Sequence, residues 1–230
     1  MIKILLLQSA FFISLLSSAQ TYSDLRDQGY TGPVKQVTTK FFSAISLHNG
    51  KWNVNDSLYP GIVLIETFNK EGDFIHKETR TTFDTSIAEY IYSNKENPGW
   101  IKKSTNGDIT ETATISRESP DMIKEVITDA SDSTKTEQIR VLNNHNRTKT
   151  LEEKGYDSKG KLVYYTVSTN EDDNQGRFWK VKIENKLKKT IDIFNYQLLK
   201  RDKYDNPTEI ITMKNGKVTG IRLVTILYYP

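Results

Sequence analysis

Apolar and polar residues alternate with a period of two along much of the chain, and this pattern constrains the fold more than any other feature. Between residues 178 and 183, Trp179, Val181 and Ile183 fall on one side and two lysines on the other. Similar alternation runs through residues 37–47, 109–115 and 218–229. Successive side chains of a β-strand point to opposite faces, so these segments are predicted to be half-buried strands.

Turn sequences separate the alternating segments. Asn49-Gly50, Asn106-Gly107 and Asn215-Gly216 are typical of type I′ hairpin turns, which need positive φ angles. Residues 69–72 and 157–160 fit longer loops in which Asn or Asp opens a type I turn and Gly takes the left-handed position. We therefore predict an all-β protein.

The predicted architecture is an antiparallel β-meander of about a dozen strands, mostly joined by tight turns to their sequence neighbours. Its stacked hairpins form either an open, single-layer twisted sheet or a partly closed one. Evidence for helix is confined to residues 21–29, where Ser23 could cap one short turn. Residues 191–199 contain Ile193, Phe194 and Tyr196, which favour a strand.

The first nineteen residues have the form of a cleavable export signal. A basic start at Lys3 precedes an apolar stretch over residues 4–16, and Ser17-Ser18-Ala19 supplies the small residues of a cleavage site. The apolar stretch is shorter than the ~20 residues that span a bilayer. We therefore predict a signal peptide over 1–19, a single all-β domain over 20–230, and a periplasmic or secreted location.

The chain contains no cysteine. This excludes disulfides, zinc–thiolate sites, iron–sulfur clusters and cysteine nucleophiles. It also excludes a lipid anchor carried on a cysteine. An exported chain without disulfides depends on ordinary core packing for its stability.

A weak repeat combines an aromatic residue, then Asn or Asp, then a turn. It occurs as Phe68-Asn69-Lys70-Glu71-Gly72 and as Tyr156-Asp157-Ser158-Lys159-Gly160, with a degenerate copy at Tyr204-Asp205-Asn206-Pro207. At these residues the chain resembles the YD-repeat (Rhs-like) proteins, and most closely the short exported versions found in Bacteroidota. The segment 32–39 resembles the start of such proteins. The resemblance implies hairpin architecture and an exported location, and it implies no activity.

No recognisable catalytic machinery is present. His48, His76 and His145 lie in different segments, and the sequence has no zinc-binding helix, nucleophile elbow or phosphate-binding loop. The acidic segment 170–176 is the best metal candidate, because alternate oxygen ligands suit Ca²⁺, but its glycine is displaced for a calcium loop. We predict no catalytic residue, no cofactor and no metal.

Two features are candidates for partner binding. Residues 177–203 hold nine basic residues against three acidic ones, a net charge of +6 that suits an acidic partner, although a solvated face explains it equally well. Exposed tryptophans could stack on sugars or anchor a protein, although core or rim packing is the simpler explanation for each, and for Trp179 above all. The predicted partner-binding residues are Trp52, Trp100, Arg177, Lys180, Lys182, Lys186, Lys188 and Lys189.

The function predicted from these features is that of an exported, non-catalytic binding or assembly module of the cell envelope. It would act through a sheet face or an edge strand, with the C-terminal strand from Val218 as the first candidate for strand addition, although this strand could equally be covered within the fold. The alternatives are a carbohydrate-binding module using Trp52 and Trp100, or a periplasmic inhibitor or immunity protein against a toxin. The expected partner is an envelope protein or an extracellular glycan, with no nucleic acid, no membrane span and no lipid anchor.

Overall fold

The computed structural model describes residues 24–43, 45–48, 51–54, 61–81, 87–92, 99–104, 106–172 and 178–230. These residues form one four-residue helix, α2 (Asp24–Asp27), followed by strands only. The strands are β1 (Val34–Phe42), β2 (Ile45–His48), β3 (Lys51–Val54), β4 (Ile62–Phe68), β5 (Phe74–Thr81), β6 (Ile87–Tyr92), β7 (Gly99–Lys103), β8 (Ile109–Ser119), β9 (Met122–Asp129), β10 (Lys135–Leu142), β11 (Thr148–Tyr156), β12 (Leu162–Asp172), β13 (Phe178–Asn185), β14 (Thr190–Arg201), β15 (Pro207–Lys214) and β16 (Lys217–Tyr228).

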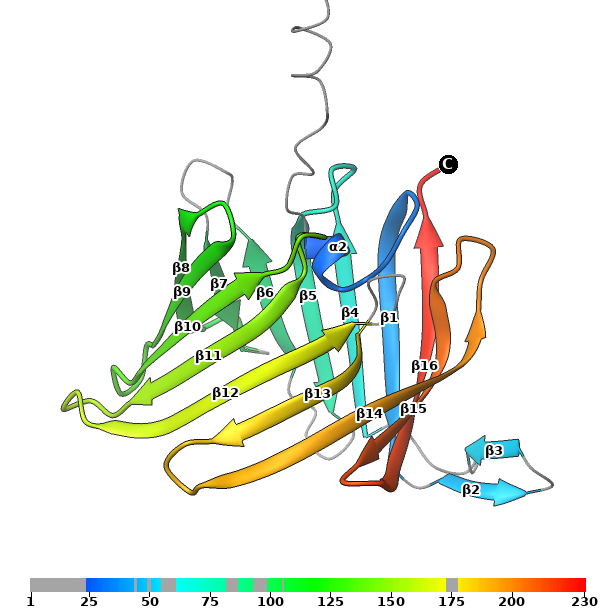
Figure 1. Cartoon of the computed structure of the whole chain (residues 1–230). Coiled ribbons are helices and arrows are strands. Elements are labelled where there is room, and N and C mark those ends of the chain that lie inside the picture. Colours follow the sequence, from blue (N-terminus) through cyan, green and yellow to red (C-terminus); the bar gives the residue numbers. More distant parts are fainter. Residues whose placement is uncertain are drawn as a thin grey trace, which may run out of the picture.

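The strands form an antiparallel meander that closes on itself (Figure 1). From β4 to β16 each strand pairs with its sequence neighbours, and β1 then pairs with both β16 and β4. Val37, for example, lies opposite Ile226 of β16 and opposite Glu66 of β4. The predicted all-β antiparallel meander is confirmed, and the sheet is a closed barrel, with β2 and β3 forming a separate two-stranded ribbon.

Closure corrects two predictions. The C-terminal strand β16 pairs with β15 on one side and with β1 on the other, so its proposed role in strand addition is wrong. The alternating segment 37–47 is not one strand either, because β1 ends at Phe42 and Ser43 forms a bend. Val37 and Phe41 both face the inside of the barrel, as the alternation predicts.

Of the three predicted type I′ turns, only Asn215-Gly216 is confirmed. Asn106-Gly107 belongs to a longer loop in which Gly107 donates its N–H to the Ser104 carbonyl at 2.9 Å, and Asn49-Gly50 lies outside the described residues. Asn215 and Gly216 both have positive φ angles, 49° and 79°, as a type I′ turn requires. Gly72 and Gly160 take the left-handed position with φ angles of 88° and 76°. The predicted short helix and the strand over residues 191–199 are present as α2 and as part of β14.

One turn geometry occurs four times among the described residues. Each turn opens with an Asn or Asp whose side-chain oxygen accepts a hydrogen bond from the backbone N–H four residues later, at 2.9 to 3.0 Å. The opening residues are Asn69, Asn143, Asp157 and Asp202. The third repeat copy therefore starts at Asp202 rather than Tyr204, and Asp205, with a φ angle of 65°, takes the place of the glycine.

The segment 24–33, here named the N-terminal plug, lies against one end of the barrel, where three of these turns also lie (Figure 1). Its contacts reach all three turns. Leu25 donates its backbone N–H to the Gly72 carbonyl at 2.9 Å, and Asp27 accepts from the Thr148 backbone at 2.6 Å. Thr31 bonds to Asn206. The plug thus joins strands that are far apart around the barrel.

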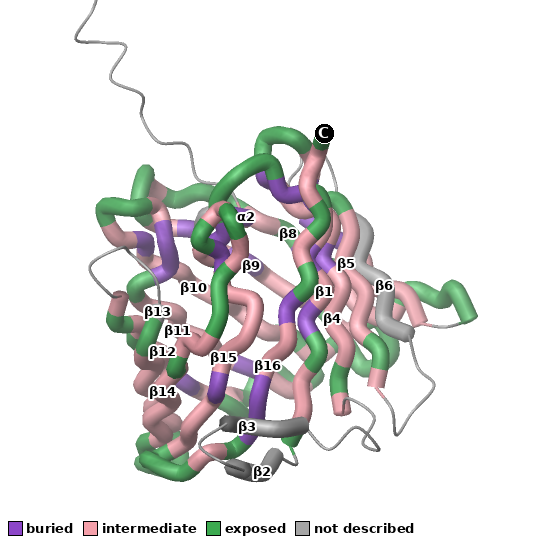
Figure 2. The backbone as a smooth tube through the Cα atoms, turned by 90° about the vertical axis from the view of Figure 1, so that its right-hand side faces the viewer, coloured by how far each residue is buried: buried purple, intermediate pink, exposed green. Residues whose placement is uncertain are grey.

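The main hydrophobic cluster lies between the plug and the inner face of β1, β4 and β16. Leu25 and Tyr30 of the plug pack with Val34, Val37, Phe68 and Val224, all of them buried (Figure 2). The rings of Phe68 and Phe74 stack at 4.8 Å beside this cluster. This cluster holds six of the twelve buried apolar residues in the described part of the chain, so packing against the plug supplies about half of the fully buried apolar side chains.

We predict that Asn206→Ala destabilises the protein by about 2–4 kcal/mol, because Asn206 is only 1% exposed and fastens the plug. Its side chain accepts from the Thr31 N–H at 2.7 Å, and it donates to the Thr31 carbonyl and to the Tyr228 hydroxyl, both at 2.8 Å. Chemical denaturation measures the change. Asn195→Ala, on the outward face of β14, is the control and is expected to stay within about 0.5 kcal/mol of wild type. Equal effects of the two substitutions would contradict this role of Asn206.

Candidate functional site: a cavity inside the barrel

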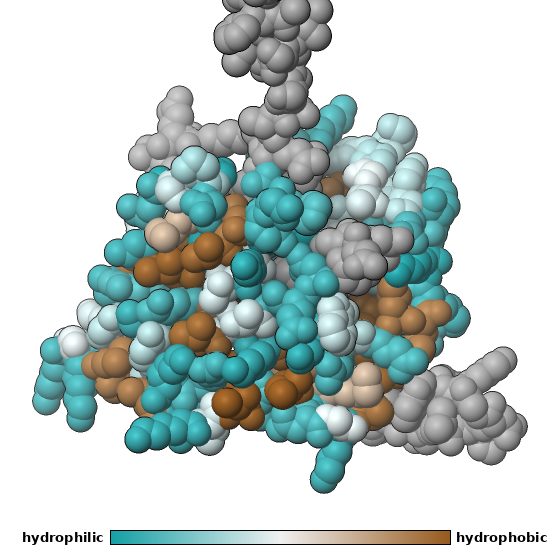
Figure 3. Space-filling view, viewed as in Figure 1, coloured by the Kyte–Doolittle hydropathy of each residue, from teal (hydrophilic) through white to brown (hydrophobic). Residues whose placement is uncertain are grey.

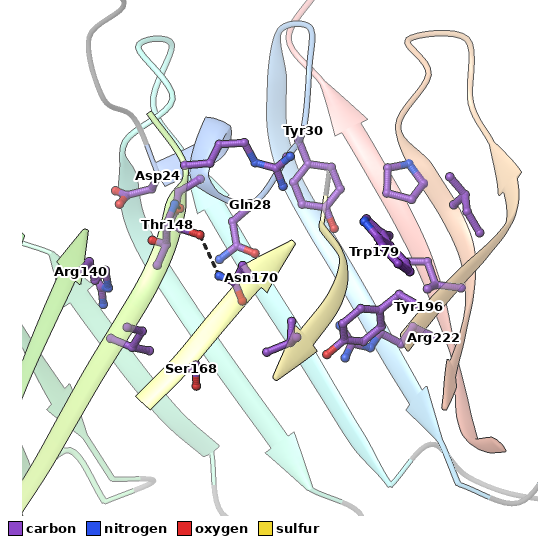
Figure 4. A pocket seen from close by; sticks show the side chains of 18 of the residues that line it. Asp24, Gln28, Tyr30, Arg140, Thr148, Ser168, Asn170, Trp179, Tyr196 and Arg222 are labelled. Atoms are coloured by element: carbon purple, nitrogen blue, oxygen red, sulfur yellow. Dashed lines mark hydrogen bonds between the residues drawn. The ribbon is translucent and has the colours of Figure 1, made fainter. Parts of the chain in front are cut away.

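A cavity of about 570 Å³ lies inside the barrel beside the plug (Figure 4). Its walls come from the plug, from β5 and from the inward faces of β10 to β16. This volume is within the range of small-molecule sites, about 300–1,000 Å³. This cavity is here named the lumen site. Because successive side chains of a strand point to opposite faces, only every second residue of a strand can reach it.

One wall of the lumen site is apolar and aromatic. It consists of Trp179 and Val181 on β13, Tyr196 and Leu198 on β14, and Ile210 on β15. Trp179 is 44% exposed, so the prediction that it packs in the core is wrong. Its ring instead faces the open lumen, where few neighbours cover it.

A polar wall adjoins the apolar one, because β12 pairs directly with β13. Thr148 on β11 and Ser168 and Asn170 on β12 line it. Asn170 donates its side-chain amide to the Thr148 carbonyl at 2.8 Å (Figure 4). The Thr148 hydroxyl oxygen is buried and has no hydrogen-bond partner among the described residues.

Asn170 also opens the segment considered as a calcium loop. It lies within strand β12, and the remainder of that segment, from residue 173, is outside the described residues. Within the described ranges, no group of three or more His, Asp or Glu side chains is arranged to hold a metal ion.

Most cations around the lumen have acidic neighbours. Arg140 pairs with Glu125, and Arg201 pairs with Asp205 at 3.0 Å. Lys77 of β5 lies opposite Glu66 of β4 in the strand register. These pairs neutralise charge that would otherwise attract an anion.

Arg222 of β16 differs from these cations. Its guanidinium carbon lies 5.2 Å from the centre of the Phe41 ring and 4.7 Å from the centre of the Tyr196 ring. Both distances are within the range of cation–π contacts. Among the residues that the structure describes, none forms an ion pair or a hydrogen bond with Arg222, which faces the cavity (Figure 4).

Two titratable groups are buried where the plug meets the barrel. Glu66 is 3% exposed, and burial raises its pKa above the ordinary value, an effect that Lys77 opposes and Asp24 reinforces. Burial, followed by the charge of Glu66, also raises the pKa of Tyr30, although a hydrogen bond with Thr39 acts in the other direction. Tyr30 belongs to the plug and also lines the lumen site.

The predicted partner-binding residues do not assemble into one site. Lys180 and Lys182 alternate with the lumen-facing Trp179 and Val181, so they point outward. Lys180 pairs with Glu171 at 2.8 Å, and Lys182 pairs with Glu184 at 2.7 Å.

Lys186 also bonds to Glu184, whose pKa its two lysine partners lower to about 2. Lys188 and Lys189 lie in the exposed turn between β13 and β14. Arg177 is outside the described residues, and Trp52 lies in β3, where only the backbone is described.

Trp100 does not form the exposed platform that was considered for partner binding, and core packing, the simpler explanation, is confirmed. Trp100 is 8% exposed, and its indole N–H donates to the Glu125 carboxylate inside the barrel. Its cross-strand neighbour is Ala113, whose small side chain leaves room for the indole. The hydrogen bond to Glu125 satisfies the polar end of the buried ring.

Sequence reasoning missed Arg222, which carries the most distinctive contacts of the site. A signal was available, because Arg222 shares its strand face with the buried Val224 and with Ile226. A cation on the buried face of an amphipathic strand is unusual and points to a polar function inside the fold.

The fold and the site together define a closed antiparallel barrel with an N-terminal plug and a hollow, two-sided lumen. No protein-family model matches the sequence, and no curated protein matches it. Among solved structures, the fold is similar to a porin-like protein from Bacteroides vulgatus ATCC 8482, with a TM-score of 0.48 and 11% identity over 86% of this chain and 98% of that one. A porin-like protein from Bacteroides uniformis ATCC 8492 has a TM-score of 0.48 and 10% identity over 86% and 99% of the two chains. In the described part of the chain, no helix is long and apolar enough to cross a bilayer.

We predict that Glu66→Gln increases stability more at pH 8 than at pH 4. The folded-state pKa of Glu66 is raised above its ordinary value of 4.5, so wild type loses stability as pH rises from about 4.5 through the folded pKa. Glutamine does not ionise and removes this loss. Denaturant unfolding at both pH values gives the difference between variant and wild type, which should grow with pH. For Glu71→Gln, in an exposed turn, the difference should stay constant; equal pH dependence of the two variants would contradict the assignment.

Proposed function

We propose that the protein is an exported, non-catalytic binding protein that holds a small molecule in the lumen site. The observation that carries this proposal is the 570 Å³ cavity with an apolar wall on β13 to β15 and a polar wall on β11 and β12. Small-molecule sites are commonly concave and mostly apolar, with a few polar groups that orient the ligand. The lumen site has this composition.

A binding role inside the barrel is better supported than one at a sheet edge. Every strand of the described barrel has a partner on both sides, so strand addition would require breaking an existing ladder. The outward lysines of β13 are held in ion pairs with Glu171 and Glu184. The lumen, in contrast, presents the aromatic side chains of Trp179 and Tyr196 and the polar side chains of Ser168 and Asn170.

The acidic groups that line the lumen site have structural contacts, which supports binding rather than catalysis. Asp24 accepts a hydrogen bond from the Phe74 backbone N–H at 2.8 Å, and Asp27 accepts one from the Thr148 backbone N–H at 2.6 Å. These contacts fasten the plug to β5 and β11. Glu125, which lies outside the lining, accepts hydrogen bonds from Trp100 and from Arg140.

The outward face of β11 to β13 supports an aqueous environment on that side of the barrel. Glu152 pairs with Lys154, and Lys180 pairs with Glu171 at 2.8 Å, on positions that alternate with lumen-facing residues. Figure 3 shows hydrophilic residues over much of the face that it presents. Charged side chains of this kind favour water over hydrocarbon, in agreement with the proposed periplasmic or secreted location.

We predict that the protein binds the uncharged fluorescent dye N-phenyl-1-naphthylamine saturably, and that Ser168→Trp weakens this binding about tenfold or more. The new indole would occupy the space that the dye needs. Forcing the dye and the indole into the same space costs about 1–3 kcal/mol, which lowers the affinity for the dye. The enhancement of dye emission measures binding.

The matched control is Thr169→Trp, one residue further along β12 and exposed on the outward face. It adds the same side chain outside the barrel and should bind the dye as wild type does. Equal affinities of the two tryptophan variants, or no saturable binding to wild type, would refute lumen binding.

A further inference from the structure

We infer that the ligand of the lumen site is an organic carboxylate with an aromatic or apolar body, whose carboxylate binds Arg222. This inference rests on the proposed lumen binding and specifies its ligand class. Three observations carry it: the held orientation of the Arg222 guanidinium, the neutralisation of neighbouring cations, and the apolar wall beside it.

The two aromatic rings that contact Arg222 come from different strands. Phe41 lies directly opposite Arg222 in the pairing of β1 with β16, and Tyr196 belongs to β14. Stacking against ring faces orients the plane of a guanidinium but leaves its N–H groups available at the edges. A planar carboxylate can then accept two parallel hydrogen bonds from that edge.

Two other cations of the lumen have acidic partners. Arg140 bonds to Glu125, and Arg201 bonds to Asp205. Within the described residues, Arg222 faces the cavity with no acidic partner. A charge in such a partly buried position gains most from an anion, because the ion pair is screened less than it would be at the surface.

The surroundings of Arg222 select the rest of the ligand. Ile210 lies directly opposite Arg222 on β15, and Leu198 lies opposite Ile210 on β14. Trp179 continues this wall toward β13. An apolar or aromatic body would bury against these side chains, whereas a strongly hydrated body would leave them facing water.

The test compares 2-naphthoate with 2-naphthamide, two ligands of nearly the same shape that differ in charge. Isothermal titration calorimetry at pH 7.5 measures both affinities. Wild type is expected to bind the naphthoate about tenfold or more tightly than the amide, as a charge-assisted hydrogen bond would provide. Arg222→Gln should abolish this preference by weakening only the naphthoate, and unchanged binding of the amide shows that the variant keeps its lumen.

Arg201→Gln is the matched control, because Arg201 also lines the cavity but is paired with Asp205. It should retain the preference. Equal affinities of the two ligands for wild type would overturn the inference without affecting lumen binding, and so would a preference that persists in Arg222→Gln. Failure of wild type to bind either ligand would overturn both proposals. Because the wild-type comparison decides by itself, the inference remains falsifiable if Arg222→Gln does not fold.

Discussion

The hydrogen-bonded ladder between β1 and β16 is the interaction on which the rest of the structure depends. It joins the first and last strands of the meander over the register from Val34 to Phe42 and converts a sheet into an enclosure. With closure, one face of every strand becomes a lumen wall. Without it, Phe41 of β1 would not lie against Arg222 to complete the pair of aromatic contacts that Tyr196 of β14 begins.

The plug explains how a barrel of this width obtains a core. Side chains on a wide barrel cannot meet across its centre, so part of the interior must be filled by another segment or remain hollow. Leu25 and Tyr30 fill one end, and the turns that open at Asn69, Asn143 and Asp202 hold the plug through backbone and side-chain hydrogen bonds. The space beside the plug remains as the lumen site. Stability and binding therefore have a common origin in where this short segment lies.

The sequence was informative wherever the structure depends on local patterns. The alternation of apolar and polar residues placed Trp179 and Val181 on one face of β13 and the lysines on the other. The pair Asn215-Gly216 predicted a hairpin turn at these two residues. Each of these patterns depends on only a few neighbouring residues. Closure was not predictable in this way. The β1–β16 pairing joins residues about 190 positions apart, and alternation assigns faces without saying which strands meet.

The same limit applies to the candidate site. The burial of Trp100 depends on Ala113 and Glu125, which are its neighbours on other strands and in sequence lie 13 and 25 residues away. The sequence shows Arg222 as a cation on the apolar face of a strand, but it does not show that Phe41 and Tyr196 contact this side chain. The resemblance to YD-repeat proteins stays a prediction.

The most direct measurement of the central claim is a disulfide cross-link between β1 and β16. Thr38 and Thr225 are paired in the register, and the chain has no cysteine of its own. Paired antiparallel residues have Cα atoms about 4.5–5.5 Å apart, within the range of disulfides. The variant Thr38→Cys/Thr225→Cys should oxidise to an intramolecular disulfide in the folded protein, and Thr38→Cys/Thr150→Cys, with its second cysteine on β11, should not. Failure of the first pair to cross-link while the protein stays folded would show that the sheet is open.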